Sequence, residues 1–302
     1  MPSMEVIAPA NHLEITGACL CGAVSYVARE RPRLAEYCHC AMCRKSHGAA
    51  FSANAALPAA KFALALGEDA IITHRSSLGR ERCFCRHCGS SLFLRRLSEP
   101  EQVVLHLGGL RGDFAPRPER HVFVGSKAPW YPLRDALPRF SIYPGFEPTT
   151  DTVAAPGAPA AASALEGSCL CGQVGYTLPG RVFFLNHCHC SRCRRFTGSA
   201  FGSYLHAAGE GFAWTRGAEY VTSYESSPGN MRAFCQACGG KLPVLEEEGS
   251  HAIVPAGSLD TDPAVTASAQ FFCGSKAPWF EISDPAPCYD AFPPGAFWEQ
   301  WD

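Results

Sequence analysis

The cysteines are the residues of this chain most able to do chemistry. Seventeen stand in 302 residues, and fourteen fall into three motifs, C-x-C-G, C-H-C-x-x-C and C-x-x-C-G, each of which occurs twice. The N-terminus has no basic stretch followed by an apolar one, so we expect no secretory signal and a cytoplasmic protein. In a reducing compartment, clustered cysteines favour metal binding over disulfides. The cysteines therefore predict zinc sites.

The first and last motifs together supply four ligands in each half of the chain. C-x-x-C-G has the form of a zinc knuckle, in which glycine gives the backbone the freedom to turn both sulfurs toward one ion. C-x-C-G supplies two more sulfurs if it lies on a strand, because residues i and i+2 share a face. Four thiolates make a closed structural site. The expected ligands are Cys19, Cys21, Cys85 and Cys88, and then Cys169, Cys171, Cys235 and Cys238.

The middle motif leaves three cysteines in each half. These are Cys38, Cys40 and Cys43, and then Cys188, Cys190 and Cys193. Three protein ligands leave one position open, as in a catalytic zinc site, and that position suits the deprotonated sulfur of a soluble thiol. The alternative is a structural zinc whose fourth ligand is water or histidine. His39 and His189 are the candidates, although a residue between two ligand cysteines usually points away.

The chain is two copies of one unit. "GACLCGAVSY" at 17–26 recurs as "GSCLCGQVGY" at 167–176, and "GSKAPW" at 125–130 recurs unchanged at 274–279. The offset is 150 residues at Cys38 and Cys188 and 149 at the last block, which indicates one deletion. A repeat this long indicates a duplicated domain. We expect domains at 13–145 and 165–295, an Ala- and Pro-rich linker at 146–164, and contact between the domains.

Local patterns favour strands. "AVSYVA", "FGSYLHA", "VVLHLGGL" and "RHVFVG" are rich in β-branched and aromatic residues, and 28 glycines and 24 prolines keep the elements short. We expect mostly antiparallel β-structure, with a short helix at "SRCRRFTG", 191–198, and at its counterpart in the first copy.

Composition and charge exclude some partners. No apolar run approaches the roughly 18 residues of a membrane span, so we expect no membrane partner. Residues 1–150 carry 18 Lys and Arg against 13 Asp and Glu, whereas residues 151–302 carry 8 against 15. A nucleic-acid binder usually has one concentrated basic face, which this distribution does not favour.

The order and spacing of C-x-C-G, C-H-C-x-x-C-R, F-C-x-x-C-G and S-K-x-P-W resemble the glutathione-dependent formaldehyde-activating enzyme family, which shares its domain with centromere protein V. The resemblance covers nearly the whole chain, in two copies. It implies an all-β fold of coiled antiparallel sheets (the β-tent type), with one structural and one catalytic zinc per copy, or up to four Zn²⁺ per chain. It also implies carbon–sulfur lyase chemistry, in which formaldehyde and glutathione condense to S-hydroxymethylglutathione or the reverse.

Each copy departs from the family pattern at one place. Members commonly have G-S-L-D and a histidine before S-K-x-P-W. The second copy has "GSLD" at 257–260 but Gln270 in place of the histidine, whereas the first has His121 but Arg111 opposite Asp260. One copy has drifted toward a scaffold role, or the two accept different substrates.

Two further groups have both a functional and a structural interpretation. Lys127, Trp130, Lys276 and Trp279 lie in the repeated S-K-A-P-W and either contact the glutathione-like ligand or close the core. Arg44 and Arg194 follow the three-cysteine clusters and either attract an anionic thiol or are solvated.

We therefore expect a zinc enzyme that acts on a thiol and a small electrophile such as formaldehyde, with the six cysteines of the middle motifs as its catalytic ligands. The alternatives are a non-catalytic tandem zinc-binding interaction module and a zinc or thiol reservoir. Of the three cysteines without a counterpart, Cys83 and Cys273 are expected to be ordinary buried thiols, and Cys288 is left unassigned.

Overall fold

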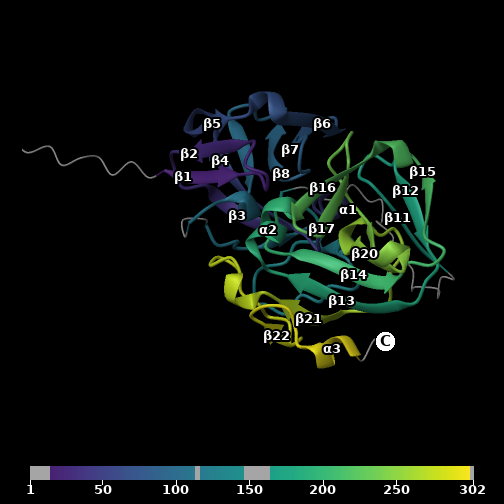
Figure 1. Cartoon of the computed structure of the whole chain (residues 1–302). Coiled ribbons are helices and arrows are strands. Elements are labelled where there is room, and N and C mark those ends of the chain that lie inside the picture. The colour runs from purple at the N-terminus through teal and green to yellow at the C-terminus, as the bar shows by residue number, and fades with distance from the viewer. Residues whose placement is uncertain (1–13, 113–115, 146–163, 300–302) are drawn as a thin grey trace, which may run out of the picture.

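The computed structural model describes residues 14–112, 116–145 and 164–299, and in this part the protein is built almost entirely of β-strands. The two copies lie against each other in one body (Figure 1). The predicted all-β fold is therefore confirmed. The expected linker, 146–164, lies outside the described residues except for Ala164.

The first copy contributes ten strands and one helix to the described part. The strands are β1 Ile15–Ala18, β2 Ser25–Ala28, β3 Arg33–Cys38, β4 Ser52–Pro58, β5 Phe62–Leu66, β6 Ile71–Ser77, β7 Arg80–Cys85, β8 Ser91–Arg96, β9 Gln102–His106 and β10 His121–Val122. The helix is α1, Ala41–His47, and the single turn η3, Leu107–Gly109, follows β9.

The second copy repeats this order and adds elements at its end. Its strands are β11 Leu165–Ser168, β12 Gly175–Leu178, β13 Val182–Cys188, β14 Gly202–Ala208, β15 Ala213–Arg216, β16 Val221–Ser227, β17 Asn230–Cys235, β18 Lys241–Leu242, β19 Val244–Glu246, β20 His251–Pro255, β21 Ala267–Phe271 and β22 Cys288–Tyr289. Its helices are α2 Ser191–Thr197 and α3 Gly295–Glu299, and the turn η7, Ala256–Ser258, corresponds to η3. The helix expected at 191–198 is therefore present.

Each copy has a small sheet and a larger one. The small sheets are β1-β2-β5 and β11-β12-β15, and the large sheet of the first copy has the order β10-β3-β4-β9-β8-β7-β6. Neighbouring strands are antiparallel, as expected, except that β10 joins β3, and β21 joins both β13 and β22, in parallel.

One proline divides the large sheet of the second copy. Its strands fall into β19-β20-β14-β13-β21-β22 and β16-β17-β18, and the break between β18 and β19 is at Pro243. The matching residue in the first copy is Phe93, which pairs with both Cys83 and Leu105 within the continuous β8. Proline has no N–H to donate to a sheet, so the ladder ends where it stands.

The two copies share one hydrophobic core. Buried residues of both belong to a single cluster, in which the Phe51 and Phe201 rings pack edge to face at 5.2 Å. Helix α1 packs against η7 of the other copy, and α2 packs against η3 in the reciprocal way. At the second contact a Cβ on Gly108 would lie 2.3 Å from the Ser199 carbonyl oxygen, so only glycine permits this approach. The expected contact between the copies is therefore present.

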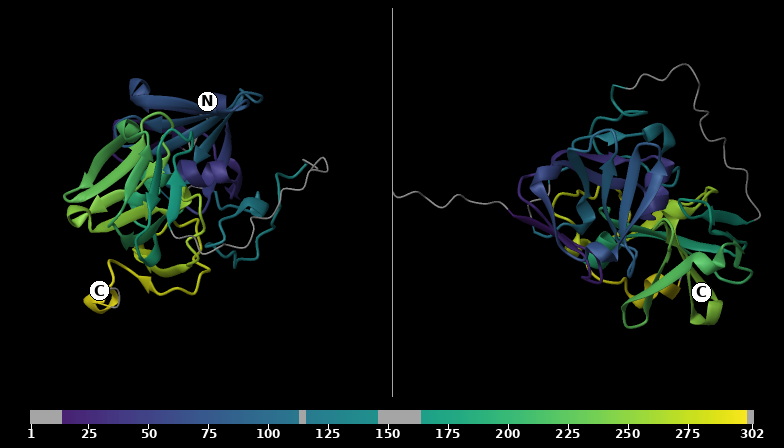
Figure 2. Two further views of the ribbon diagram at one scale, coloured as in Figure 1. Left: turned by 90° about the vertical axis from the view of Figure 1, so that its right-hand side faces the viewer. Right: turned by 90° about the horizontal axis from the view of Figure 1, so that it is seen from above.

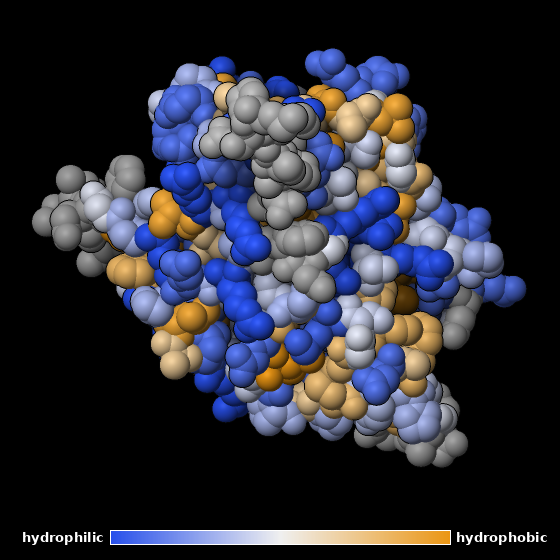
Figure 3. All heavy atoms as spheres, turned by 90° about the vertical axis from the view of Figure 1, so that its left-hand side faces the viewer, coloured by the Kyte–Doolittle hydropathy of each residue, from blue (hydrophilic) through white to orange (hydrophobic). Residues whose placement is uncertain are grey.

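The two further views show the same close packing of the purple-to-blue first copy on the green-to-yellow second copy (Figure 2). On the face shown in Figure 3, apolar residues form small patches separated by polar and charged ones. Among the described residues, no helix has the length and apolar character needed to cross a membrane.

Candidate metal centres

The structure assembles the fourteen matched cysteines into four groups. In two of them, Cys19, Cys21, Cys85 and Cys88, and Cys169, Cys171, Cys235 and Cys238, all four Sγ atoms lie within 4.8 Å of one another. An ideal tetrahedral zinc with four sulfurs has Sγ–Sγ edges of roughly 3.8 Å. The Cys19–Cys21 and Cys21–Cys85 distances are 3.4 and 3.7 Å, and their counterparts are 3.4 and 4.0 Å. The donor set and its size therefore fit zinc.

The knuckle turns have the predicted geometry. Gly89 has φ of +68° and Gly239 of +70°. Each donates its backbone N–H to the carbonyl oxygen of the first cysteine of its C-x-x-C. This left-handed conformation is costly for residues with a side chain, which explains the glycine after each motif.

The strand argument for C-x-C-G was wrong. Strand β1 ends at Ala18, so Cys19 and Cys21 lie in the bend that follows it. The bend is closed by the backbone N–H of Val24, which donates to the Cys19 Sγ at 3.2 Å, and Val174 repeats the contact with Cys169. The two sulfurs converge because the chain reverses, not because they share a strand face.

The remaining two groups are Cys38, Cys40 and Cys43, and Cys188, Cys190 and Cys193, each again with all Sγ atoms within 4.8 Å of one another. In the first copy, Cys38 ends β3, Cys40 is the N-cap of α1, and Cys43 lies in its first turn. The Cys40 Sγ accepts the Cys43 N–H at 3.4 Å, and Cys190 and Cys193 repeat this contact. A strand end and a helix start thus place three sulfurs together.

An arginine that the sequence analysis missed contacts each three-cysteine group. Arg82 donates to the Cys43 Sγ at 3.6 Å, and its counterpart Arg232 donates to the Cys193 Sγ at 3.4 Å. In the second copy, Tyr204 accepts from Arg232 at 3.0 Å and donates to the same sulfur at 3.5 Å. Both arginines stand three residues before the knuckle, and this match between the copies was the available signal.

Charge and burial oppose each other at these arginines. Burial disfavours the charged guanidinium of Arg232, but the charges and hydrogen bonds of Cys193 and Tyr204 together outweigh it, and the net effect raises the arginine pKa. Hydrogen bonds from Cys188 and Cys190, together with the charge of Arg232, hold the pKa of Cys193 well below its usual value. Hydrogen bonds within the group and burial raise the pKa values of Cys188 and Cys190 instead, so the negative charge of the group lies on Cys193.

The histidines between the ligand cysteines point away from the sulfurs. His39 Nε2 lies 2.8 Å from His121 Nδ1, whose ring in turn contacts Asp135, and His189 Nε2 lies 2.8 Å from the Gln270 Oε1. Among the described residues, no histidine atom joins either three-cysteine group within 4.8 Å of all its sulfurs. No histidine of this part of the chain therefore completes either group in the structure, although His206 and His106 line the spaces beside them.

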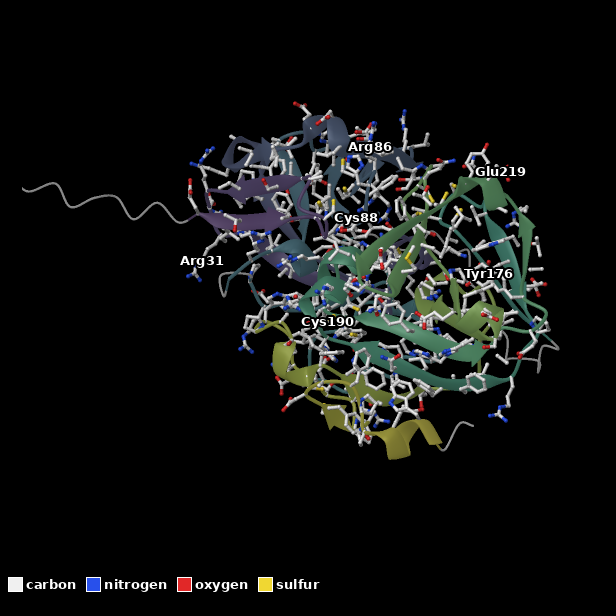
Figure 4. The ribbon with its side chains drawn as sticks, viewed as in Figure 1. Arg31, Arg86, Cys88, Tyr176, Cys190 and Glu219 are labelled. Atoms are coloured by element: carbon white, nitrogen blue, oxygen red, sulfur yellow. The ribbon has the colours of Figure 1, made fainter. Side chains whose placement is uncertain are left out.

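A hollow opens beside the cysteines of the second copy. It has a volume of about 200 Å³, and Cys188, Cys190 and Cys193 all contribute to its wall. The corresponding space beside Cys38 and Cys43 is about 20 Å³. In Figure 4, Cys190 lies within the molecule, as does Cys88, whereas the exposed Arg31 and Glu219 lie at its periphery.

The four S-K-A-P-W residues do not line the spaces beside the three-cysteine groups. Trp130 and Trp279 are buried, and Trp130 packs near His187 of the other copy, with ring centres 6.4 Å apart. Lys276 donates to the Phe280 carbonyl oxygen at 3.0 Å, and Lys127 lies 3.5 Å from the matching oxygen of Tyr131. None of the four lines the hollow at either three-cysteine group. Their geometry is that of a core-closing turn, and their assignment as glutathione contacts stays a prediction.

The structure also places the two arginines that follow the three-cysteine groups and two of the unmatched cysteines. Arg194 donates to the carbonyl oxygens of His189 and Ser275, and Arg44 is half-buried, so neither arginine is simply solvated. Cys83 is buried as expected, but Cys273 is only half-buried because it begins a surface turn.

The contact between the copies explains the difference between Arg111 of the first copy and Asp260 of the second. Its carboxylate accepts from Lys45 of the first copy at 2.6 Å and from Ser168 at 2.6 Å. The reciprocal positions hold Arg195 and Arg111, which cannot form such a pair. The G-S-L-D aspartate thus anchors α1 of the other copy.

Lys241 lies between the two knuckles and is fully buried. Its ammonium group donates to the carbonyl oxygens of Gly89 and Gly239 at 2.6 and 2.8 Å and to the Ser91 hydroxyl at 3.0 Å. Burial lowers its pKa to about 7, against the opposing charge of the knuckle cysteines. One cation therefore links the two four-cysteine groups.

Comparison with known proteins agrees with this architecture. The family model for "Glutathione-dependent formaldehyde-activating enzyme" matches residues 14–126 and 164–275. A Halomonas elongata protein named "Putative glutathione-dependent formaldehyde-activating enzyme" is 29% identical over 141 residues, which is 43% of this chain and 88% of that protein. A crystal structure of a Rhodobacter sphaeroides protein is 27% identical and covers 32% of this chain and 88% of that one; its TM-score of 0.29 supports no conclusion. The chain belongs to the glutathione-dependent formaldehyde-activating enzyme family, as two tandem copies.

Proposed function

We propose that the protein is a zinc-dependent carbon–sulfur lyase that joins glutathione, or a similar thiol, to formaldehyde or another small carbonyl compound, and catalyses the reverse cleavage. The observation that carries this proposal is the three-cysteine group of the second copy, whose sulfurs form part of the wall of a hollow. Family membership supports the glutathione and formaldehyde chemistry. The four-cysteine groups are proposed as structural zinc sites.

The addition balances without a redox partner. The thiol sulfur bonds to the carbonyl carbon, the C=O π bond breaks, and the thiol proton passes to the carbonyl oxygen. Zinc bound by Cys188, Cys190 and Cys193 would supply a Lewis acid that favours the deprotonated thiol.

The chain's own residues prepare this centre. Arg232 and Tyr204 both donate to the Cys193 Sγ, which reduces the negative charge on the cluster. A less negative cluster accepts another anionic sulfur more readily, so the pair lowers the cost of binding the substrate thiol. In the first copy only Arg82 does this, because Asn54 replaces Tyr204.

Elemental mass spectrometry of the purified, reduced protein tests the metal assignment. We expect four zinc ions per chain, one for each cysteine group. Cys43→Ser and Cys193→Ser should each lose one, whereas the control Cys83→Ser should lose none. Carbon-13 NMR with labelled formaldehyde and glutathione then follows formation of S-hydroxymethylglutathione.

Two zinc ions per chain, unaffected by glutathione, would remove the catalytic assignment of the middle cysteines. That outcome would favour the alternative of a non-catalytic tandem zinc-binding interaction module. Four zinc ions without faster formation of S-hydroxymethylglutathione would leave the metal sites intact and refute only the formaldehyde reaction. The cytoplasmic location and the domain limits at 13–145 and 165–295 stay predictions.

A further inference from the structure

An ion-pair network lies beside the first copy's three-cysteine group, in which Glu36 is buried and Arg120 and Tyr143 are half-buried. Arg120 donates to the Glu36 carboxylate at 2.8 and 3.1 Å and to the Tyr143 hydroxyl at 3.3 Å, and its guanidinium lies over the Tyr143 ring. Glu36 lies in β3, Arg120 directly precedes β10, and Tyr143 follows β10. The remaining space of about 20 Å³ holds roughly one water molecule.

The second copy has none of the three residues of this network. The residues at the matching positions are Asn186, Ala269 and Phe292. Asn186 and Ala269 pair between β13 and β21, which confirms that they occupy the place of Glu36 and Arg120. Glu36 and Tyr143 line the space of about 20 Å³ in the first copy, whereas Asn186 and Phe292 line the hollow of about 200 Å³ in the second, where Ala269 provides no guanidinium to join them.

Aromatic rings line the opened space. Phe271, Phe272, Phe292 and Trp298 contribute to its wall, and Phe292 is 63% exposed. The Phe272 and Phe292 rings lie 4.9 Å apart, and the Phe271 and Trp298 rings 5.9 Å. Trp298 comes from α3, and the residue that matches it by sequence in the first copy is Thr149. An aromatic cluster with one exposed ring beside a reactive centre is typical of a site for an apolar ligand.

The hollow also extends away from the cysteines. A neighbouring depression of about 810 Å³ shares His206, Phe292 and Trp298 with it. A ligand anchored at the sulfurs therefore has room to pass the aromatic rings and reach the outer edge of the second copy.

We propose that the second copy binds glutathione-type thiol adducts that carry an aromatic group, and that the first copy excludes them. The inference rests on the proposed function in taking the thiol sulfur to lie at Cys188, Cys190 and Cys193. The aromatic group then packs on Phe271, Phe292 and Trp298. The same atom balance holds as for formaldehyde, with an aromatic aldehyde as the carbonyl partner.

Isothermal titration calorimetry of the zinc-loaded full chain with S-benzylglutathione tests this directly, because binding of this stable thioether requires no turnover. We expect one binding site per chain. The triple variant Asn186→Glu/Ala269→Arg/Phe292→Tyr, which installs the first copy's network, should weaken binding at least tenfold. The reciprocal Glu36→Asn/Arg120→Ala/Tyr143→Phe should create a second site.

Trp298→Ala keeps the test decisive if the triple variant folds poorly, since it changes one half-buried side chain and should weaken binding about fivefold. Two equal sites, no binding, or full affinity in a folded, zinc-loaded Trp298→Ala variant would overturn the inference. One site lost on substitution, with no S-hydroxymethylglutathione formed by any variant, would instead refute the proposed function and leave this pocket assignment standing.

Discussion

Replacing Lys241 with methionine tests the interface that joins the two knuckles. Methionine is similar in length but donates no hydrogen bonds, so the carbonyl oxygens of Gly89 and Gly239 would lose their shared donor inside the protein. The ring of Phe196 would also lose the ammonium 4.9 Å from its centre. The change therefore removes a cation without creating a large cavity.

The expected loss of stability follows from these contacts. Each buried carbonyl left without a donor costs about 1–3 kcal/mol, so the two together cost about 2–6 kcal/mol. Relief from burying the ammonium offsets part of this, because burial lowers the pKa of Lys241 to about 7. We expect Lys241→Met to lower the free energy of unfolding by about 3 kcal/mol.

Urea unfolding of the zinc-loaded protein at pH 7.5, followed by tryptophan fluorescence, measures this change. The control is Lys61→Met, at an exposed lysine, which should change stability by less than about 0.5 kcal/mol. Zinc content must be equal in all three proteins. A Lys241→Met protein within about 1 kcal/mol of the wild type would refute the reasoning, because the ammonium would then contribute little to holding the copies together.

Three other changes test separate parts of the structure. Gly108→Ala should lower stability by about 1–3 kcal/mol because its Cβ would meet the Ser199 carbonyl oxygen, whereas Gly79→Ala has open space; equal melting temperatures would contradict this. Burial and the charge of His251 lower the pKa of His206 to about 3, so below about pH 6.5 the unfolded chain takes up a proton that the folded chain does not. Stability should thus fall with acid, and between pH 7.5 and 5 His206→Ala should lose about 2 kcal/mol less than the wild type; parallel pH curves would argue against a neutral buried His206. Stripping zinc with a chelator should unfold the knuckles, and a metal-free chain that melts at the temperature of the loaded chain would show that the four-cysteine groups carry no structural ion.

The geometry within each cysteine motif could be predicted because it is short-range, whereas the meeting of C-x-C-G with C-x-x-C-G, 64 residues apart at Cys21 and Cys85, was inferred from the four ligands of a closed zinc site. C-x-x-C-G turns over four residues, and C-H-C-x-x-C crosses one strand end and one helix start, so spacing alone limits which sulfurs meet. Even there the sequence suggested the wrong cause for C-x-C-G, since a strand and a tight bend both bring Cys19 and Cys21 to one side. The division of the sheet at Pro243 was also available from the sequence, because proline interrupts what the first copy builds as one strand.

That the copies touch was expected, but the residues that make the contact could not be predicted, since they have no local relation in the sequence. Lys45 meets Asp260, and Lys241 meets Gly89, over separations of more than 150 residues. Comparing the copies indicated only that Arg111 and Asp260 differ. The structure explains this difference, because Asp260 contacts Lys45 of the other copy.

The duplication explains why a closed first copy would be retained. Helix α1, which carries Cys43, packs on η7 of the second copy, and α2, which carries Cys193, packs on η3 of the first. Each three-cysteine group therefore takes part of its support from the other copy. If the second copy alone binds the larger adduct, the first must still present η3, Gly108 and Phe51 to keep α2 in place. Selection on the first copy would then act on its interface and its knuckle. The residues near Cys38, namely Glu36, Arg120 and Tyr143, would not be constrained by binding of the adduct.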